Sequence, residues 1–232
     1  MKMIMKLLLI LLLWPSLVSA YELDFSGFAS TVQGRTTPLR MHNLGDGTDL
    51  MYTHLSHDRG FGMGGRVTLW QGWLGIGPEL SRFHTDLKAQ NSLRSGVIQG
   101  QPQPTVTCQG SCMPGFFDWG QTTLVVTHAM LNAYLRYPGE QWRPYLGLGS
   151  GISWATAQGV LPNGQGASDQ APVVQALAGI VYKTVDRLSL YFEYRYSYAY
   201  YQFGFPGYTG QTIIEKNIPV DHLTVGISYV LW

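Results

Sequence analysis

Apolar residues alternate with small or polar ones in short segments throughout the chain, and this period of two constrains the fold more than any other feature. From Leu188 to Ser197 the even positions are leucine, phenylalanine or tyrosine, whereas the odd ones include serine, glutamate and arginine. A strand separates such residues onto two faces, whereas a helix would mix them. Eight segments fit this pattern: 23–32, 58–70, 74–81, 128–137, 145–154, 172–183, 188–197 and 223–231.

The first twenty residues have the features of an export signal. Lys2 and Lys6 precede an apolar core, Leu7 to Trp14, that is too short to span a bilayer, and the small residues 18–20 precede Tyr21. We therefore predict a signal peptide over 1–20 and a single domain over 21–232, with a retained membrane anchor as the alternative. No later segment approaches the roughly 18 apolar residues of a transmembrane helix. A membrane crossing by the exported chain would therefore use strands.

Composition excludes two other classes of protein. Only 12% of the 232 residues are charged, 45% are hydrophobic, and the formal net charge is +1. A disordered chain needs low hydrophobicity and high net charge, and a nucleic-acid binder needs a basic surface. Neither description fits this sequence.

The connections between the eight segments alternate in length. Tight turns rich in Gly, Pro and Asp are predicted at 70–73, 137–142 and 183–187, and long polar loops near 33–57, 87–120, 156–171 and 198–220. Short turns at one rim and long loops at the other are typical of outer-membrane barrels, whose loops are extracellular. The predicted fold is all-β, a closed eight-stranded antiparallel up-and-down transmembrane β-barrel.

A soluble lipocalin-type barrel is the structural alternative, because it also has eight strands and an export signal. The face opposite the apolar row carries charged residues and many glycines, which is too polar for a lipocalin interior. Aromatic residues beside the short turns also favour a membrane barrel, since such rings form girdles at headgroup level. The predicted girdle residues are Trp70, Trp73, Tyr137, Trp142 and Tyr182.

Three stretches, 143–151, 188–196 and 222–229, carry a resemblance to a known family. The chain resembles the small eight-stranded outer-membrane β-barrel proteins of the OmpA/OmpX-like family. The resemblance implies a monomer in the outer membrane of a Gram-negative bacterium, in contact with outer-membrane lipids and lipopolysaccharide. It also implies a C-terminal signal for the outer-membrane insertion machinery, here Tyr229, Leu231 and Trp232, although the apolar row ends on Leu231 and leaves Trp232 out of register.

Alternate positions of a strand point to opposite faces, and we call the even or odd set to which a residue belongs its parity. Four charged residues have the parity of the inward face on their strands: Arg66, Glu79, Glu193 and Arg195. Charge facing lipid would cost roughly 2 to 4 kcal/mol near the midplane, so we predict a barrel-interior charge network of these four residues. Such a network fills a narrow lumen, and a gate is the alternative; a broad pore is disfavoured. Pro78 lies within a predicted strand, where we expect a β-bulge.

The longest predicted loop contains the two cysteines of the chain. We predict a disulfide between Cys108 and Cys112, because an exported chain meets an oxidising compartment; free thiols or a metal clip are the alternatives. Loop aromatics are candidates for contact with a host or cell surface, and the alternative is that they pack on each other or form a rim girdle. They are Phe116, Phe117, Trp119, Tyr200, Tyr201, Phe203 and Phe205.

The predicted function is non-enzymatic: support of the envelope, or surface interaction such as adhesion. The alternative is a lipid A esterase or acyltransferase, which would need a serine and a histidine at the membrane rim, for example Ser81 with His84 or His128. We expect no catalytic residues, cofactor, metal or nucleic-acid partner. The pair His54 and His57 is only a weak indication of a surface metal site.

Overall fold

The computed structural model describes residues 21–35, 37–43, 49–98, 101–103, 106–107, 122–158, 166–206 and 211–231. These residues form strands and short turns, and none of them belongs to a helix that could span a membrane. The strands are β1 Tyr21–Gly34, β2 Thr37–Asn43, β3 Asp49–His57, β4 Arg59–Gln71, β5 Leu74–Ile98, β6 Gln101–Gln103, β7 Val106–Thr107, β8 Thr122–Arg136, β9 Trp142–Gln158, β10 Ala167–Lys183, β11 Leu188–Pro206 and β12 Gln211–Val230.

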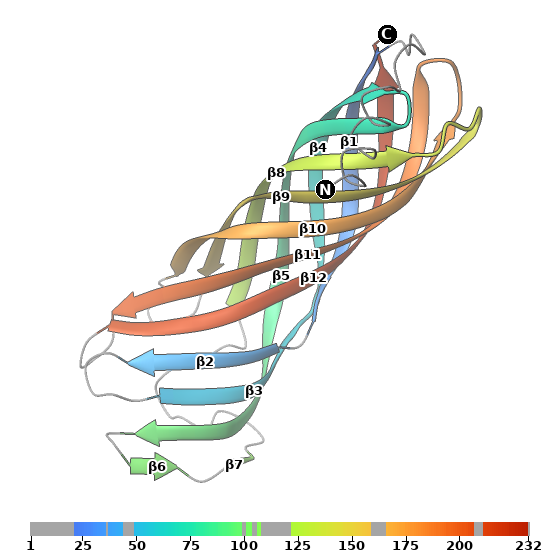
Figure 1. The fold of residues 1–232 in the computed structure, drawn as a ribbon. Helices are drawn as coiled ribbons and strands as arrows, with labels where there is room; N and C mark the ends of the chain where they lie inside the picture. Colours follow the sequence, from blue (N-terminus) through green and yellow to red (C-terminus); the bar gives the residue numbers. More distant parts are fainter. Residues whose placement is uncertain are drawn as a thin grey trace, which may run out of the picture.

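Eight of these strands close into an antiparallel barrel, in the order β1-β4-β5-β8-β9-β10-β11-β12 (Figure 1). The ring closes where β1 pairs with β12, in a register that runs from Asp24 opposite Val230 to Gly34 opposite Val220. Closure gives every central strand two partners and leaves no free edge in the wall. The predicted fold and the three predicted tight turns are confirmed; in the first turn Gly72 has a φ of 62°, which favours glycine.

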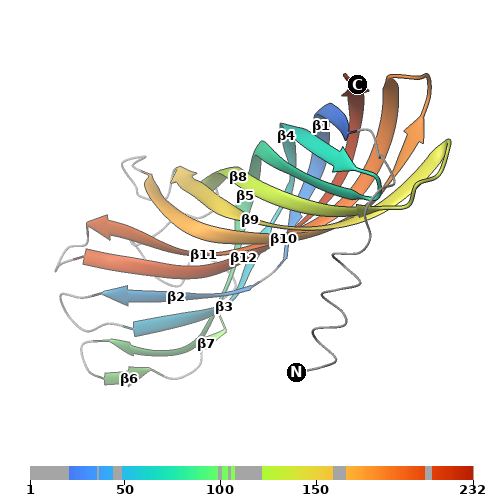
Figure 2. The same ribbon diagram turned by 45° about the horizontal axis from the view of Figure 1, so that its top comes forward.

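In the described residues the predicted long loops are mostly strands, which corrects the boundaries 33–57, 87–120, 156–171 and 198–220. β5, β11 and β12 continue far beyond the barrel, and the β2–β3 hairpin fills the space between β12 and β5 where β1 and β4 have ended. Figures 1 and 2 show the resulting curved sheet at the end opposite the C-terminus. We call it the extracellular sheet, after the side on which outer-membrane barrels carry their long connections. A strand whose outer face meets water needs no row of apolar side chains on that face. These segments therefore lack the apolar alternation from which the barrel strands were predicted.

Exposure alternates along every barrel strand, and the exposed row is apolar. Leu80, Leu146 and Leu148 are 60%, 61% and 70% exposed, while their strand neighbours point inward. Large exposed aliphatic side chains on all sides of a closed sheet require a hydrocarbon solvent. This apolar belt ends at Asp221 on β12 and Arg82 on β5, where polar residues take over the outer face. The belt excludes the soluble lipocalin-type barrel.

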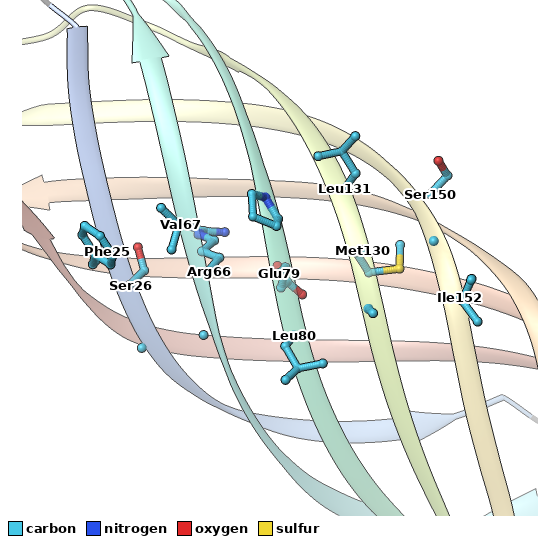
Figure 3. A pocket seen from close by; sticks show the side chains of 15 residues that line it. Phe25, Ser26, Arg66, Val67, Glu79, Leu80, Met130, Leu131, Ser150 and Ile152 are labelled. Atoms are coloured by element: carbon cyan, nitrogen blue, oxygen red, sulfur yellow. The ribbon is translucent and has the colours of Figure 1, made fainter.

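A groove of about 860 Å³ crosses the middle of the belt over β1, β4, β5, β8 and β9 (Figure 3). Small residues form its floor, between larger side chains such as Phe25, Leu80 and Leu131. Because this groove faces lipid along its whole length, we expect acyl chains of the bilayer to occupy it.

Four of the five predicted girdle residues lie as expected beside the short turns. Trp73, Tyr137 and Trp142 are at least half exposed, and Tyr182 packs on Trp142 with ring centroids 4.5 Å apart. The prediction for Trp70 is wrong, since its side chain is buried inside the barrel. On β4 the even positions face the lumen, and Trp70 shares that parity with Arg66.

The predicted β-bulge at Pro78 is also wrong. The pairs of β4 with β5 on either side of it, Arg66 with Glu79 and Leu69 with Ile76, keep one register. Pro78 points outward and interrupts the ladder only locally. Next to it, a Cβ on Gly77 would lie 1.9 Å from the carbonyl oxygen of Val67, so the glycine permits a close approach of the two backbones.

Candidate functional site

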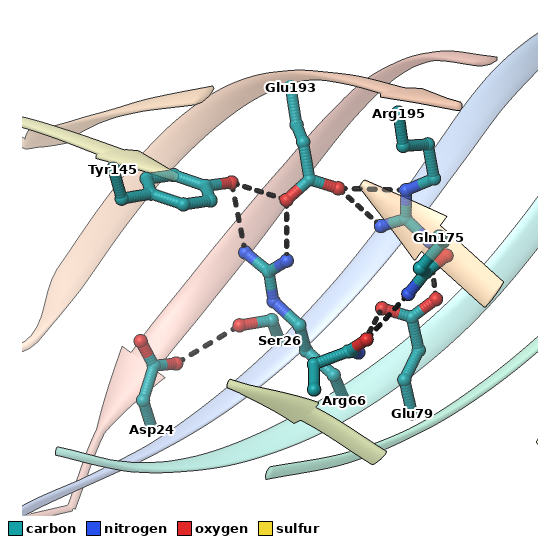
Figure 4. Close-up of polar contacts among 9 residues, drawn as sticks. Asp24, Ser26, Arg66, Glu79, Tyr145, Gln175, Glu193 and Arg195 are labelled. Atoms are coloured by element: carbon teal, nitrogen blue, oxygen red, sulfur yellow. Dashed lines mark hydrogen bonds and ion pairs between the residues drawn. The ribbon is translucent and has the colours of Figure 1, made fainter. Parts of the chain in front are cut away.

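An ionic cluster closes the lumen at the level of the belt, and its four charged residues are those selected from the sequence by parity (Figure 4). Arg66 Nη1 lies 2.7 Å from Glu193 Oε2, and Arg195 Nε donates to Glu193 Oε1 over 2.8 Å. Arg195 Nη1 also donates to Glu79 Oε1. Two guanidinium groups and two carboxylates therefore balance in charge.

Neutral side chains from three further strands complete the cluster. Tyr145 on β9 donates its hydroxyl proton to Glu193 Oε2 over 2.6 Å. Asn132 on β8 donates to Glu79 Oε2 over 3.3 Å, and Gln175 on β10 donates to Asn132 Oδ1 over 2.6 Å. Each carboxylate oxygen thus accepts hydrogen bonds, which offsets the cost of removing the charge from water.

Aromatic rings cover the guanidinium planes. The centroid of the Phe28 ring lies 4.5 Å from Arg195 Cζ, and the Tyr191 centroid lies 4.5 Å from Arg66 Cζ. Glu193 is 0% exposed and Glu79 only 3%. Residues lining a water-filled channel would be accessible to water, so the lumen is closed at this level.

A second layer lies between this cluster and the short turns. Trp70, Tyr134, Tyr145 and Leu177 form a buried cluster there. Arg136 Cζ stands 4.1 Å from the Trp70 ring centroid, and Arg136 Nη2 lies 2.9 Å from a carboxylate oxygen of Glu22. The aromatic layer and the ionic cluster together fill the half of the barrel nearer the short turns.

A serine–histidine pair lies in the lumen on the extracellular side of the ionic cluster. Ser197 Oγ and His222 Nε2 are 3.2 Å apart, and both residues are buried. Phe83 packs edge-on against His222 and also against His128, with centroids 5.1 and 5.3 Å apart. Among the described residues, His222 has no hydrogen bond to a carboxylate that would orient it as a base. The pair points into the barrel rather than toward lipid.

The serine and histidines selected from the sequence for esterase chemistry are only partly brought together. Ser81 and His128 are register partners on β5 and β8, and both face the lumen. His84 points out of the barrel instead, because it has the outward parity of β5.

The aromatic residues at the end of β11 divide between two faces. Tyr198 and Tyr200 are exposed, and their hydroxyl groups bond to Asn217 and Gln202. Tyr201 and Phe203 are 1% and 5% exposed, so the prediction that these two offer a contact surface is wrong. The strand continues through this segment, and the odd positions turn inward.

Two basic residues are buried on the inner face of the extracellular sheet, beyond the belt. Lys216 Nζ donates to the Thr37 carbonyl oxygen over 3.4 Å, and neither ring nitrogen of His57 has a hydrogen-bond partner among the residues that the structure describes. Burial lowers the pKa of Lys216 to about 7. Burial, together with the nearby charge of Lys216, lowers the pKa of His57 to about 3.

Several predicted features lie outside the described residues. They are the signal peptide over 1–20, Cys108, Cys112, Phe116, Phe117, Trp119, Trp232 and the side chain of Phe205. Of the predicted insertion signal, Tyr229 and Leu231 are described, and both side chains lie exposed at the rim. The disulfide, the aromatic contacts of the longest loop and the insertion signal remain predictions.

Sequence reasoning missed Tyr145, Gln175 and the pair Ser197–His222 as lumen partners. Parity alone places each of them on an inner face. Which inner residues meet depends on the stagger between strands around the barrel, which parity does not give.

No family model matches the sequence, and no curated protein matches it. Solved structures do match. OprG from Pseudomonas aeruginosa has a TM-score of 0.53 at 12% identity, over 91% of this chain and 97% of that one. Neisserial surface protein A has a TM-score of 0.49 at 14% identity, over 88% and 96%. The outer membrane protease OmpT from Escherichia coli has a TM-score of 0.43 at 9% identity, over 94% and 99%.

At this identity the likeness to OprG establishes the fold alone. The chain therefore has the fold of small outer-membrane β-barrel proteins. That fold, combined with the apolar belt, places the chain in the bacterial outer membrane as a membrane-spanning barrel.

Proposed function

We propose that the chain is a non-enzymatic outer-membrane protein that supports the envelope or attaches the cell to another surface through its extracellular sheet. One observation carries this proposal: the lumen is closed by buried ion pairs, while β5, β11 and β12 continue beyond the belt and form a sheet there with the β2–β3 hairpin. A closed barrel serves as an anchor rather than a pore, and the extended strands give it a rigid platform in the medium.

The outer face of β11 and β12 is the part of this platform best suited to contact. Tyr200 is exposed, and Gln202 Nε2 lies 3.2 Å from Glu215 Oε1 on the neighbouring strand. Tyr198 donates to Asn217 Oδ1 over 2.7 Å. Tyrosine held by polar neighbours is common in protein interfaces, because it adds a large contact area with few rotatable bonds.

Cell attachment tests this proposal. Bacteria that express the full chain should adhere to a cultured epithelial monolayer more than cells with an empty vector, and the double variant Tyr198→Ser with Tyr200→Ser should lose most of the gain. Tyr137→Ser, at the opposite rim, is the matched control and should adhere like the wild type. Equal adhesion of all strains, with each protein folded in the membrane, would contradict the surface-contact role.

Lipid A modification is the second candidate, and Ser197–His222 is the pair that would favour it. Its position inside a packed lumen argues against it, because an acyl chain of lipid A would have to enter the barrel. Mass spectrometry of lipid A from expressing cells separates the candidates. We expect an unchanged acylation pattern; a new species that disappears in Ser197→Ala would establish the enzyme.

A further inference from the structure

A pocket of about 500 Å³ lies on the outer face of the barrel at the extracellular edge of the belt. Its lining residues come from the end of β1 and the residue that follows it, from the start of β4, and from the middle of β11 and β12. They are Thr31, Val32, Gln33, Arg35, Arg59, Tyr194, Asp221 and Leu223. The pocket is thus apolar on the side of the belt and charged on the side of the medium.

One wall of the pocket is an ordered pair of charges. Arg35 Nε and Nη2 lie 2.7 and 2.9 Å from the two carboxylate oxygens of Asp221, in a bidentate arrangement. Tyr194 donates its hydroxyl proton to the same carboxylate, and Arg35 Cζ stands 5.0 Å from the Tyr196 ring centroid. These contacts hold the guanidinium of Arg35 in one orientation and cancel most of its charge.

The other wall carries an unpaired charge. Arg59 is exposed beside Gln33, its register partner on β1. Within the described part of the chain, Arg59 has neither a hydrogen bond nor an ion pair from its side chain. The two arginines and one aspartate give the pocket a net charge of one positive unit, located at Arg59.

The level of the pocket in the membrane determines what kind of ligand it can bind. Leu223, Val225 and Ile227 continue the outer row of β12 toward the middle of the membrane, and they are all at least half exposed to lipid. Asp221 marks the level at which this row becomes polar, which is the level of the headgroups. A molecule that fills the pocket must therefore offer an anion at headgroup level and an apolar part along the belt. Guanidinium groups match phosphate in shape and hydrogen bonding.

We infer that this pocket binds a phosphorylated lipid of the outer leaflet, with Arg59 as the ligand of the phosphate and the apolar chains against Thr31 and Leu223. The inference rests on the outer-membrane location in the proposed function, and it names a lipid partner of the barrel. Arg35 and Asp221 form the fixed wall against which the headgroup packs.

Electron paramagnetic resonance of spin-labelled lipids tests the site. The full-length chain is reconstituted in phosphatidylcholine vesicles, and the immobilised fraction of spin-labelled phosphatidic acid is compared with that of spin-labelled phosphatidylcholine at constant ionic strength. The wild type should prefer the phosphatidic acid probe, and Arg59→Gln should reduce this preference by about fivefold. Arg187→Gln, an exposed arginine at the opposite rim, is the control and should leave the preference unchanged.

The other outcomes overturn the inference. No preference in the wild type, or the same loss in both variants, would show that the barrel lacks this site and only attracts anions generally. Competition by inorganic phosphate at the same ionic strength would show that the site takes free phosphate rather than a lipid. If the protein is folded and heat-modifiable in these vesicles, none of these outcomes counts against the proposed function. If the protein fails to insert into the vesicles, the proposed function is refuted instead.

Discussion

Arg66 on β4 and Glu193 on β11 meet across the lumen, with Arg66 Nη1 2.7 Å from Glu193 Oε2 and both side chains at most 6% exposed. Four strands separate β4 from β11 along one arc of the barrel and two along the other, so the pair ties distant parts of the wall together. The same carboxylate group also accepts hydrogen bonds from Arg195 and Tyr145.

Loss of this carboxylate should destabilise the barrel strongly. Glu193→Gln leaves two buried guanidinium groups with one carboxylate, and removing one partner of a buried ion pair typically costs about 3 to 5 kcal/mol. Urea unfolding in lipid vesicles measures the change. Glu140→Gln, in an exposed turn, should change the free energy of unfolding by less than about 0.5 kcal/mol. Equal stability of the two variants would mean that the cluster does not hold the barrel together.

Conductance should appear when the cluster is truncated without changing its net charge. The double variant Glu79→Ala with Arg195→Ala removes two large side chains that fill the lumen at the level of the belt. In planar lipid bilayers we expect no steady conductance from the wild type and brief openings from the double variant. A stable open channel in the wild type would contradict the closed lumen.

Glycine positions on opposite faces should respond oppositely to alanine. At Gly77 a Cβ would meet the Val67 carbonyl oxygen at 1.9 Å, so Gly77→Ala must push two backbones apart and should destabilise the barrel. At Gly27 no atom lies within 4 Å of the added carbon, so Gly27→Ala should be neutral or stabilising by about 0.5 to 1 kcal/mol. Urea unfolding compares the two, and the reverse order would contradict the close approach at Gly77.

Stability should rise with pH through two windows because of the extracellular basic pair. The pKa of His57 is about 3 in the folded chain against 6.5 ordinarily, and that of Lys216 is about 7 against 10.5. Between each pair of values the unfolded chain binds more protons, so raising the pH favours the folded state. The slope is at most about 1.4 kcal/mol per pH unit for each group.

The variant Lys216→Met removes the group responsible for the upper pH window and so tests that window separately from His57. From pH 7 to about 10 the wild type should gain stability relative to this variant, as measured by protease resistance of the extracellular sheet. Lys183→Met, at a short turn on the other rim, controls for the loss of one lysine and should follow the wild type. A parallel pH profile for wild type and Lys216→Met would refute the lowered pKa of Lys216.

Sequence alone predicted the eight spans, the short turns and the inner position of the charged residues. These features follow from one constraint, since a strand in a bilayer must face hydrocarbon with one side and the lumen with the other. The constraint ends at the belt edge near Asp221. Beyond it, β2, β3 and the ends of β11 and β12 form a sheet whose outer face meets water, so the bilayer imposes no apolar row that the sequence would show.

Side-chain partners in the lumen were harder to predict than faces. Parity placed Arg66 and Glu193 inside, but their meeting depends on the tilt and stagger of strands far apart in sequence. The error at Trp70 is of another kind, because its closeness to a turn suggested the girdle although the alternation along β4 already places it in the lumen. The pocket around Arg59 has no sequence signature, since its residues come from four strands.

Lipid contact of the outer face is the central claim, and site-directed spin labelling measures it directly. Single cysteines are introduced at Asp221, Leu223, Val225 and Ile227 in the background Cys108→Ser with Cys112→Ser, and the full chain is reconstituted in vesicles. Labels at 223, 225 and 227 should be reached by oxygen and shielded from a water-soluble nickel complex, with a change toward nickel access at 221. Ready access of the nickel complex at all four positions would contradict a membrane-spanning barrel.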